Sequence, residues 1–172
     1  MLKETKRILF ATDLSKECQM AYDYAVSLAL SCQGSITLLH VIESSPDSVE
    51  NLVKNLLGED RYTDIMAKHE QDTRSILIGK RKESDIVQAA LFTFCEEAGK
   101  NQAGCYLQPD EILILHGDIV KTIVATATEK KMDLIVMSAH KSILSSDTSV
   151  TKVAKGILRH SKIPILIVPP QG

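Results

Sequence analysis

RILFATDLSKECQMAYDYAVSLALSCQGSITLLHVI, residues 7–42, is the stretch that decides the fold. Arg7–Asp13 is a short apolar run that ends in small and polar residues, which is typical of a buried strand. Apolar residues then recur at helical spacing from Lys16 to about Cys32, and Ser35–Ile42 is a second segment rich in β-branched residues. A strand, a helix and a strand within about 40 residues form a βαβ unit, which implies parallel strands and a right-handed crossover.

The ends of the first helix carry recognisable capping residues. Either Asp13 or Ser15 can cap its start, because both side chains accept hydrogen bonds from backbone N–H groups. Gly34 stands at the position expected of a C-terminal cap. These signals place the helix between two strands without a long loop on either side.

The second half of the chain continues the same alternation. Further strands are predicted at Glu111–His116, Asp133–Met137 and Pro164–Pro169, and helices at residues 119–131 and about 148–160. This order predicts an α/β fold with an open five-stranded parallel sheet and helices on both faces. No repeat or linker divides the sequence, so residues 1–172 are expected to form one domain.

Residues 44–108 form an enlarged region between the second and third strands. A short helix is expected at Ser48–Leu57, and Arg61 to about Lys100 has a mostly helical pattern. Gly79 and the charged run at residues 80–83 predict a break or bend in it. We therefore expect an extended helical insertion in the domain.

Composition narrows the classes of function. The 172 residues carry a formal net charge of −2, which gives no bulk attraction to nucleic acid or to an anionic membrane. No apolar run approaches the roughly 18 residues of a membrane span, and the four cysteines are widely spaced, so a cytoplasmic protein is expected. The histidines and cysteines show no metal-ligand spacing, and no nucleophile is paired with a base, so we expect no enzyme and no metal.

Ligands of open parallel sheets bind beyond the carboxyl ends of the strands. The residues at and just after the ends of the predicted strands are therefore the first candidates for a site: Asp13, Val41, Glu43, His116–Asp118 and Ser138–Lys141. Asp13 can either contact a ligand or cap the helix that follows it, and the sequence leaves both roles open. His116–Asp118 is more typical of a turn and a helix cap.

Four segments together resemble the universal stress protein family: ILFATDLS, LLHVIE, HGDIVKTIVATATEKKMDLIVMSAHK and VAKGILRHSKIPILIVPP, in this order. The resemblance covers nearly the whole chain apart from residues 44–108. It implies a Rossmann-like fold of the adenine nucleotide α-hydrolase type, and a stress-response module that binds or signals without catalysis. It also implies a homodimer formed through the C-terminal strand, at Ile165, Leu166, Ile167 and Val168.

Many members of that family bind ATP through a G-x-x-G loop after the fourth strand and a later glycine followed by a hydroxyl residue. When Met137 and His140 are aligned with this pattern, all four motif positions depart from it. The resemblance gives this set of nucleotide-binding candidates: Asp13 and Val41 at the adenine, Met137 and His140 in the loop, and Ser138, Lys141, Thr151 and Lys152 at the four altered positions. Without glycine, the backbone cannot easily converge its N–H groups on a phosphate.

Three interpretations remain open from the sequence. The first is a non-catalytic universal stress protein with a degenerate, weak nucleotide site. The second is an ATP- or AMP-binding protein in which Lys141 and Lys152 replace the glycine loop with charge-assisted contacts. The third is an interaction scaffold that recruits an unidentified protein through the helical insertion.

Overall fold

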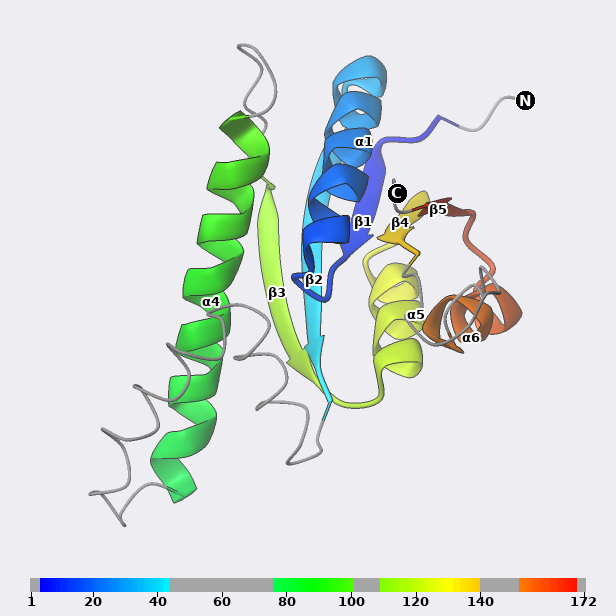
Figure 1. Cartoon of the computed structure of the whole chain (residues 1–172). Helices are drawn as coiled ribbons and strands as arrows, with labels where there is room; N and C mark the ends of the chain where they lie inside the picture. The colour runs from blue at the N-terminus through cyan, green and yellow to red at the C-terminus, as the bar shows by residue number, and fades with distance from the viewer. Residues whose placement is uncertain (1–3, 44–75, 101–108, 140–151, 170–172) are drawn as a thin grey trace, which may run out of the picture.

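The computed structural model describes residues 4–43, 76–100, 109–139 and 152–169 (Figure 1). Strands and helices alternate in these ranges. Their bounds, in chain order, are β1 Arg7–Ala11, α1 Lys16–Cys32, β2 Ser35–Ile42, α4 Ile76–Lys100, β3 Glu111–His116, α5 Ile119–Glu129, β4 Leu134–Ser138, α6 Lys152–His160 and β5 Ile165–Val168. The expected helix at Ser48–Leu57 lies outside the described residues. None of the helices in these ranges is both long and apolar enough to cross a membrane.

The five strands form one sheet in the order β3-β2-β1-β4-β5, and every neighbouring pair is parallel. The predicted five-stranded parallel sheet is therefore confirmed. β1 lies in the centre because the chain first builds outward through β2 and β3, and then returns to the other side of β1 with β4 and β5. The strand order reverses between β1 and β4, and such a switch point opens a crevice beyond the carboxyl ends of the strands.

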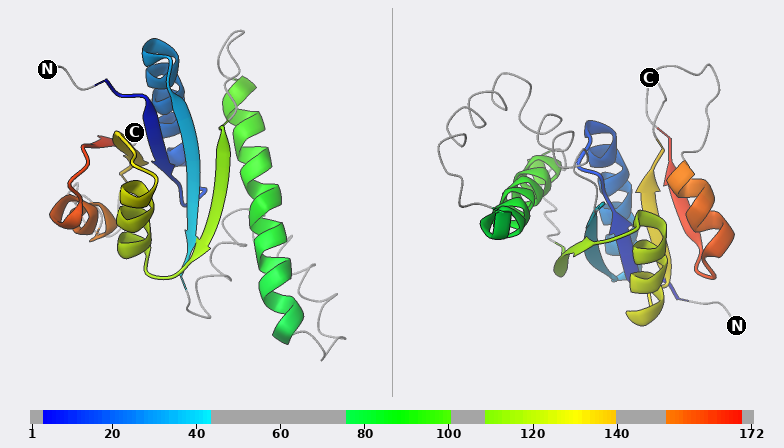
Figure 2. Two further views of the ribbon diagram at one scale, coloured as in Figure 1. Left: turned by 180° about the vertical axis from the view of Figure 1, so that it is seen from behind. Right: turned by 90° about the horizontal axis from the view of Figure 1, so that it is seen from below.

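Helices cover both faces of the sheet (Figure 2). Side chains of β1, β2 and β4 alternate between the two faces, because successive residues of a strand point in opposite directions. Ile8 and Phe10 pack with α1 and α4 on one face, whereas Leu9 and Ala11 pack with α5 and α6 on the other. The central strand is thus buried on both sides, which explains its unbroken apolar sequence.

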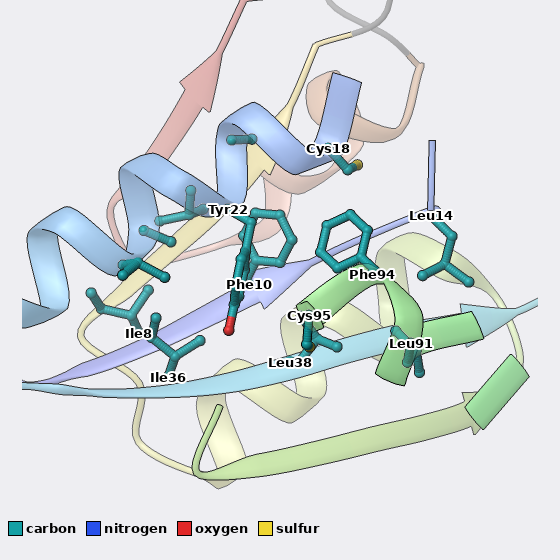
Figure 3. Close-up of a cluster of buried hydrophobic side chains, with 14 of the residues drawn as sticks. Ile8, Phe10, Leu14, Cys18, Tyr22, Ile36, Leu38, Leu91, Phe94 and Cys95 are labelled. Carbon is teal, nitrogen blue, oxygen red and sulfur yellow. The ribbon is translucent and has the colours of Figure 1, made fainter. Parts of the chain in front are cut away.

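The core under α1 and α4 contains a group of three aromatic rings (Figure 3). Phe10 of β1 lies 5.1 Å from Tyr22 of α1 and 6.3 Å from Phe94 of α4, and the rings of Tyr22 and Phe94 are 5.6 Å apart. Two of the pairs meet edge to face, the arrangement that suits the ring quadrupoles. Phe94 therefore anchors α4 to the same core as the βαβ unit.

The predicted break in the helical insertion is wrong. α4 runs without interruption from Ile76 to Lys100, through Gly79 and the charged residues 80–83. A glycine inside a helix costs only about 1 kcal/mol relative to alanine. Lysine, arginine and glutamate are themselves good helix formers, so the charged run continues the helix.

The predicted role of Gly34 at the end of α1 needs a correction. Gln33, not Gly34, adopts the left-handed conformation at the end of the helix, with φ of 51°. A side chain on Gly34 would place its Cβ 2.7 Å from the carbonyl oxygen of Lys6. Glycine is required there because the backbone before β1 passes too close for any side chain.

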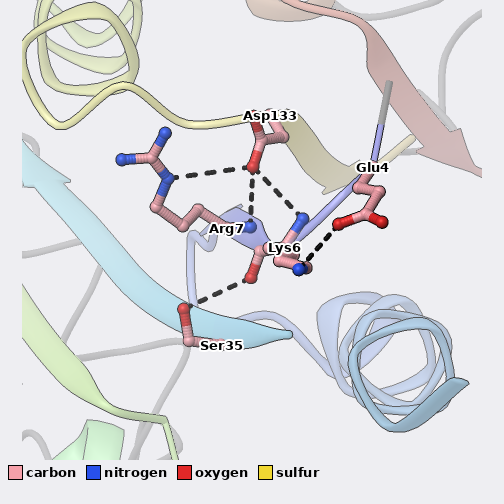
Figure 4. A network of polar contacts seen from close by, with 5 residues as sticks. All are labelled: Glu4, Lys6, Arg7, Ser35 and Asp133. Carbon is pink, nitrogen blue, oxygen red and sulfur yellow. Dashed lines mark hydrogen bonds and ion pairs between the residues drawn. The ribbon is translucent and has the colours of Figure 1, made fainter. Parts of the chain in front are cut away.

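Asp133 links the starts of β1 and β4 at the amino-terminal end of the sheet (Figure 4). Its Oδ2 accepts hydrogen bonds from the backbone N–H groups of Lys6 and Arg7, at 3.1 and 3.0 Å, and lies 3.7 Å from Nε of Arg7. These bonds hold the start of β1 against the start of β4. They lie at the end of the sheet opposite to the crevice.

Candidate functional site

A cavity of about 220 Å³ opens at the carboxyl ends of β1, β2 and β4. Its walls are mostly apolar, with a few polar groups from the strand ends and from α1. The lining residues are Ala11, Thr12, Asp13, Cys18, Leu39, His40, Val41, Ile119, Ile123, Met137, Ser138 and Val153. The cavity lies where the switch point of the strand order predicts a ligand site.

The turn after β1 presents Asp13 to this cavity. The N–H of Thr12 still donates to the carbonyl of Leu39 at 3.0 Å, which extends the pairing of β1 with β2. Leu14 then takes a left-handed conformation with φ of 66°, and its N–H donates to Oγ1 of Thr12 at 2.9 Å. Oδ1 of Asp13 accepts from the N–H of Ser15 at 3.0 Å, so the carboxylate shapes the entry into α1.

The two roles that the sequence left open for Asp13 are therefore compatible. Ser15 occupies the N-cap position of α1, but its side chain makes no capping hydrogen bond. Asp13 organises this end of the helix from two residues upstream while it also lines the cavity. A ligand can thus meet a carboxylate whose position the backbone already fixes.

Cys18 and Ser138 meet across the crevice between α1 and β4. Sγ of Cys18 lies 3.0 Å from Oγ of Ser138 and donates to Oδ1 of Asp13, also at 3.0 Å. Since the thiol has a single proton, and that proton points to Asp13, the hydroxyl of Ser138 is the donor in the other contact. Both side chains are almost fully buried, with exposed fractions of 1% for Cys18 and 3% for Ser138.

Burial raises the pKa of the Cys18 thiol, and the negative charge of Asp13 raises it further. Cys18 is therefore a neutral thiol at physiological pH. Because the thiolate is the reactive form of cysteine, this environment makes Cys18 a poor nucleophile.

His40 adds a buried polar group near the end of β2. Its Nδ1 lies 2.8 Å from the carbonyl oxygen of Thr12. A carbonyl only accepts, so Nδ1 carries the proton. Burial lowers the pKa of His40, against smaller raising effects of the Thr12 carbonyl and of Asp13. A neutral ring with its proton on Nδ1 leaves Nε2 as a hydrogen-bond acceptor.

The structure brings together half of the predicted nucleotide-binding residues. Asp13, Val41, Met137 and Ser138 line the same cavity. Lys152 is the first residue of α6 and is exposed, and it is its neighbour Val153 that reaches the cavity wall. His140, Lys141 and Thr151 lie outside the described residues.

The turn after β3 serves capping, as its sequence indicated. Oδ1 of Asp118 accepts from the N–H of Lys121 at 2.8 Å at the start of α5, and His116 is exposed.

The sequence did not single out Cys18 and His40, although both line the cavity. The available signal for His40 was a histidine between the apolar residues Leu39 and Val41 of a strand, and for Cys18 it was a cysteine in the first turn of the helix that follows Asp13.

Within the described ranges, no group of three or more histidine, cysteine or acidic side chains is arranged to hold a metal ion. The cavity instead offers a few hydrogen-bonding groups surrounded by apolar side chains. An open parallel sheet with such a cavity at its switch point defines a Rossmann-like α/β protein with a ligand crevice.

The chain belongs to the universal stress protein family, whose family model matches residues 4–169. Universal stress protein MJ0577 of Methanocaldococcus jannaschii is 21% identical over 166 residues, which cover 95% of this chain and 94% of that protein. The resemblance inferred from the sequence is confirmed.

Solved structures show the same fold. The universal stress protein UspA from Lactobacillus plantarum matches with a TM-score of 0.63 and 16% identity, covering 97% of this chain and 99% of the other. The structure of MJ0577 matches with a TM-score of 0.58 and 19% identity over 99% of both chains. A universal stress protein solved in complex with cAMP matches with a TM-score of 0.51 and 17% identity, over 97% of this chain and 98% of the other.

Proposed function

We propose that this universal stress protein is a non-catalytic binding module whose cavity receives the base of an adenine nucleotide and holds its phosphates weakly. The observation that carries the proposal is the convergence of Asp13, Val41, Met137 and Ser138 on one cavity. A relative of the same fold was solved with cAMP, which supports a nucleotide as the ligand class.

The size of the cavity supports binding of a base rather than of a whole nucleotide. Pockets that enclose drug-sized ligands typically measure about 300–1,000 Å³, and this cavity measures about 220 Å³. A flat ring can lie between the apolar side chains of Val41 and Met137, with Asp13 at its polar edge. The sugar and phosphates then extend outside the described walls.

The burial of Ser138 supports the part of the proposal that says the phosphates are held only weakly. In a phosphate loop, glycine lets backbone N–H groups approach the anion closely. Here the first of these positions carries a buried side chain whose hydroxyl is committed to Cys18. The competing proposal, that Lys141 and Lys152 bind the phosphates, is favoured only by their charge and their place in the sequence.

The state of Cys18 supports a binding role rather than catalysis. Its raised pKa and its bond to Asp13 keep the thiol protonated, so the cysteine that lines the cavity is held in its unreactive form. A reduced thiol at the centre of this network also fits a reducing compartment such as the cytoplasm.

Calorimetric titration of the purified protein with ATP, ADP and AMP, each with and without magnesium, tests the proposal. We expect weak binding that depends little on the number of phosphates and is reduced in Asp13→Asn. Micromolar affinity for ATP that is lost in Lys141→Ala and Lys152→Ala would favour the competing proposal. If none of the three ligands binds, the proposal is wrong.

We also propose that the protein forms a homodimer through β5 (Ile165–Val168), the last strand in the sheet order. Backbone N–H groups at and after β4 donate to the carbonyls of Pro164 and Val168, at 3.0 and 2.8 Å. Because hydrogen-bonding directions alternate along a strand, the backbone groups of Ile165 and Ile167 point away from β4. That edge can pair with the same edge of a second copy.

Light scattering of the full chain, coupled to size exclusion, measures the mass of the assembly. The substitution Ile167→Pro removes one N–H from the outer edge while sparing the groups that face β4, so it should shift a dimer toward single chains. Leu166→Pro is the matched variant, since it disrupts the β4 side and should destabilise the fold itself. A wild-type chain that runs as a monomer contradicts the proposal.

A scaffold role for α4 remains a second candidate, and the exposed side chains of that helix favour it. Ile86 and Phe92 are 38% and 56% exposed, although both are large and apolar. Large apolar side chains that a helix exposes to solvent can contribute to an interaction site. Loss of a co-purifying protein in a Phe92→Ala variant that still folds normally would support this candidate.

A further inference from the structure

The amino-terminal end of the sheet, opposite to the crevice, holds a further cavity of about 510 Å³. We propose that this cavity binds a small molecule that carries a phosphate group, with the phosphate on two lysine side chains and the rest of the molecule against two apolar ones. The lysines are Lys131 and Lys162, and the apolar side chains are those of Met132 and Ile163. Because the cavity is separate from the crevice, the inference does not depend on the proposed function.

The charge of the lining is the first argument. The side chains of Arg7, Lys131 and Lys162 bring positive charge to the cavity, and Asp133 brings one carboxylate. This carboxylate is engaged by Arg7, because its Oδ2 lies 3.7 Å from Nε and accepts from the backbone N–H of the same residue (Figure 4). The lining is therefore positive, although the whole chain carries a formal net charge of −2. Ammonium groups form charge-assisted hydrogen bonds with phosphate oxygens, and positive walls raise the local concentration of an anion.

The strand order explains why these charges meet. β1, β4 and β5 are neighbours in the sheet and run parallel, so their amino-terminal ends lie side by side. Arg7 begins β1, Lys131 lies between α5 and β4, and Lys162 lies between α6 and β5. The N–H of Asp133 donates to the carbonyl of Arg7 at 2.8 Å, which joins two of these strand starts directly. The cavity is thus assembled by the fold from three segments that are distant in the sequence.

Both lysines lie on turns whose backbone is held by hydrogen bonds. The hydroxyl of Ser161 donates to the carbonyl of Ile163 and accepts from the N–H of the same residue, each at 3.0 Å, so it spans Lys162. The N–H of Lys131 donates to the carbonyl of Thr128 at 3.1 Å at the end of α5. A phosphate can therefore bind without ordering either turn, which reduces the entropic cost of binding.

The backbone of Lys131 supplies an independent argument. Lys131 adopts the left-handed conformation with φ of 53°, at a position after a helix where glycine is usual because a side chain is strained there. The helix dipole does not account for the lysine, since Lys130 beside it is the C-cap of α5 and already brings positive charge to that end. Lys130 pairs with Glu111 at 2.8 Å, whereas the Lys131 side chain lines the cavity. The side chain of Lys131, not its backbone, therefore accounts for a lysine at this position.

The volume of the cavity and its apolar wall favour a phosphate ester over inorganic phosphate. Pockets for drug-sized ligands typically measure about 300–1,000 Å³, and this cavity of about 510 Å³ lies within that range. Met132 is buried and Ile163 is half-buried, and together they form the apolar part of the wall. An ester with an apolar group covers this part, whereas inorganic phosphate leaves it exposed to water.

Phenyl phosphate, inorganic phosphate and phenol are probes that separate the charge from the apolar group. In calorimetric titrations of the full-length protein, phenyl phosphate should bind about tenfold more tightly than inorganic phosphate. Phenol, which lacks the charge, should not bind measurably. Because the side chains of Lys131 and Lys162 are exposed, binding of phenyl phosphate should weaken as sodium chloride is added.

Lys131→Gly is the decisive variant, and Lys130→Ala is its matched control. Lys131→Gly should weaken binding of phenyl phosphate about tenfold. It should also raise the urea midpoint of unfolding, because glycine suits the left-handed backbone. Lys162→Ala should weaken binding as well, without a change in the urea midpoint. Lys130→Ala removes a neighbouring charge that pairs with Glu111, and it should leave the affinity unchanged.

Four results would overturn the inference or one of its steps. It is wrong if phenyl phosphate does not bind, or if Lys131→Gly keeps the wild-type affinity. An equal loss in Lys130→Ala and Lys131→Gly would show a general attraction to surface charge and no site. A lowered urea midpoint in Lys131→Gly would show that this lysine serves the fold. None of these results bears on nucleotide binding, which concerns the opposite end of the sheet.

Discussion

The substitution Phe94→Ala tests whether the helical insertion is part of the core of the domain. Phe94 lies on α4 and is only 4% exposed, because it packs against the rings of Phe10 and Tyr22. Phe92 lies two residues away on the same helix and is 56% exposed. The two positions share residue type and helix, so the difference between Phe94→Ala and Phe92→Ala isolates the effect of burial.

The expected magnitude follows from the loss of a buried aromatic side chain. Replacing a core phenylalanine by alanine typically costs about 3–5 kcal/mol, because the transferred surface and the cavity left behind both add to the loss. For Phe94→Ala we expect a loss in the upper part of this range, because the side chain also makes two ring contacts that can add about 0.5–1.5 kcal/mol each. For Phe92→Ala we expect a change within about 0.5 kcal/mol.

Urea unfolding of the purified variants, followed by circular dichroism, measures both free energies. In a thermal scan, the loss in Phe94→Ala corresponds to a fall of roughly 6–20 °C in Tm for a chain of this size. Equal stabilities of Phe94→Ala and Phe92→Ala would refute the reasoning. In that case α4 would not be packed on the sheet, and residues 44–108 would be better described as a separate unit.

Three further predictions concern close packing, pH and thiol chemistry. Gly34→Ala should lower the free energy of unfolding by about 1–3 kcal/mol, because the new Cβ would lie 2.7 Å from the carbonyl oxygen of Lys6; an unchanged urea midpoint would contradict this. The pKa of His40 is lowered by burial, so the unfolded chain binds more protons below pH about 6.5 and stability should fall as the pH drops through that range. His40→Gln should flatten this dependence in urea titrations at a series of pH values. Timed alkylation read by mass spectrometry should label Cys32 well before Cys18 in the native protein, since Cys18 is 1% exposed and has a raised pKa; equal rates would contradict the buried network.

The fold was largely predictable because its signals are local and repeated. The strands at Ser35–Ile42 and Glu111–His116 and the helix at Lys16–Cys32 were predicted with their observed bounds, since apolar periodicity and capping residues agree there. The error at Gly79 arose because one glycine and four charged residues were given more weight than the helical pattern around them. The role of Gly34 could not be predicted, because it depends on the approach of Lys6, which is close to it only in the folded chain.

The candidate site was only half predictable, and the reason is again physical. Asp13, Val41, Met137 and Ser138 follow strand ends, and the carboxyl ends of parallel strands converge on one edge, so their positions could be derived from topology. The partnership of Cys18 with Ser138 joins residues 120 positions apart in the sequence. No local pattern encodes such a contact, and the tautomer of His40 depends in the same way on a carbonyl from another strand.

The contact between Cys18 and Ser138 explains how the fold accommodates a buried serine at the end of β4. A serine at the end of β4 would carry a buried hydroxyl, and a buried polar group without a partner costs about 1–3 kcal/mol. The thiol of Cys18 accepts this hydrogen bond and donates a second one, through its own proton, to Asp13, so the three side chains form a satisfied chain across the crevice. Ser138→Gly and Cys18→Ala should therefore not be equivalent. The glycine variant removes the hydroxyl with its need for a partner, whereas the alanine variant leaves the hydroxyl buried and should be the less stable of the two in urea unfolding. The opposite order would show that the serine hydroxyl does not depend on Cys18.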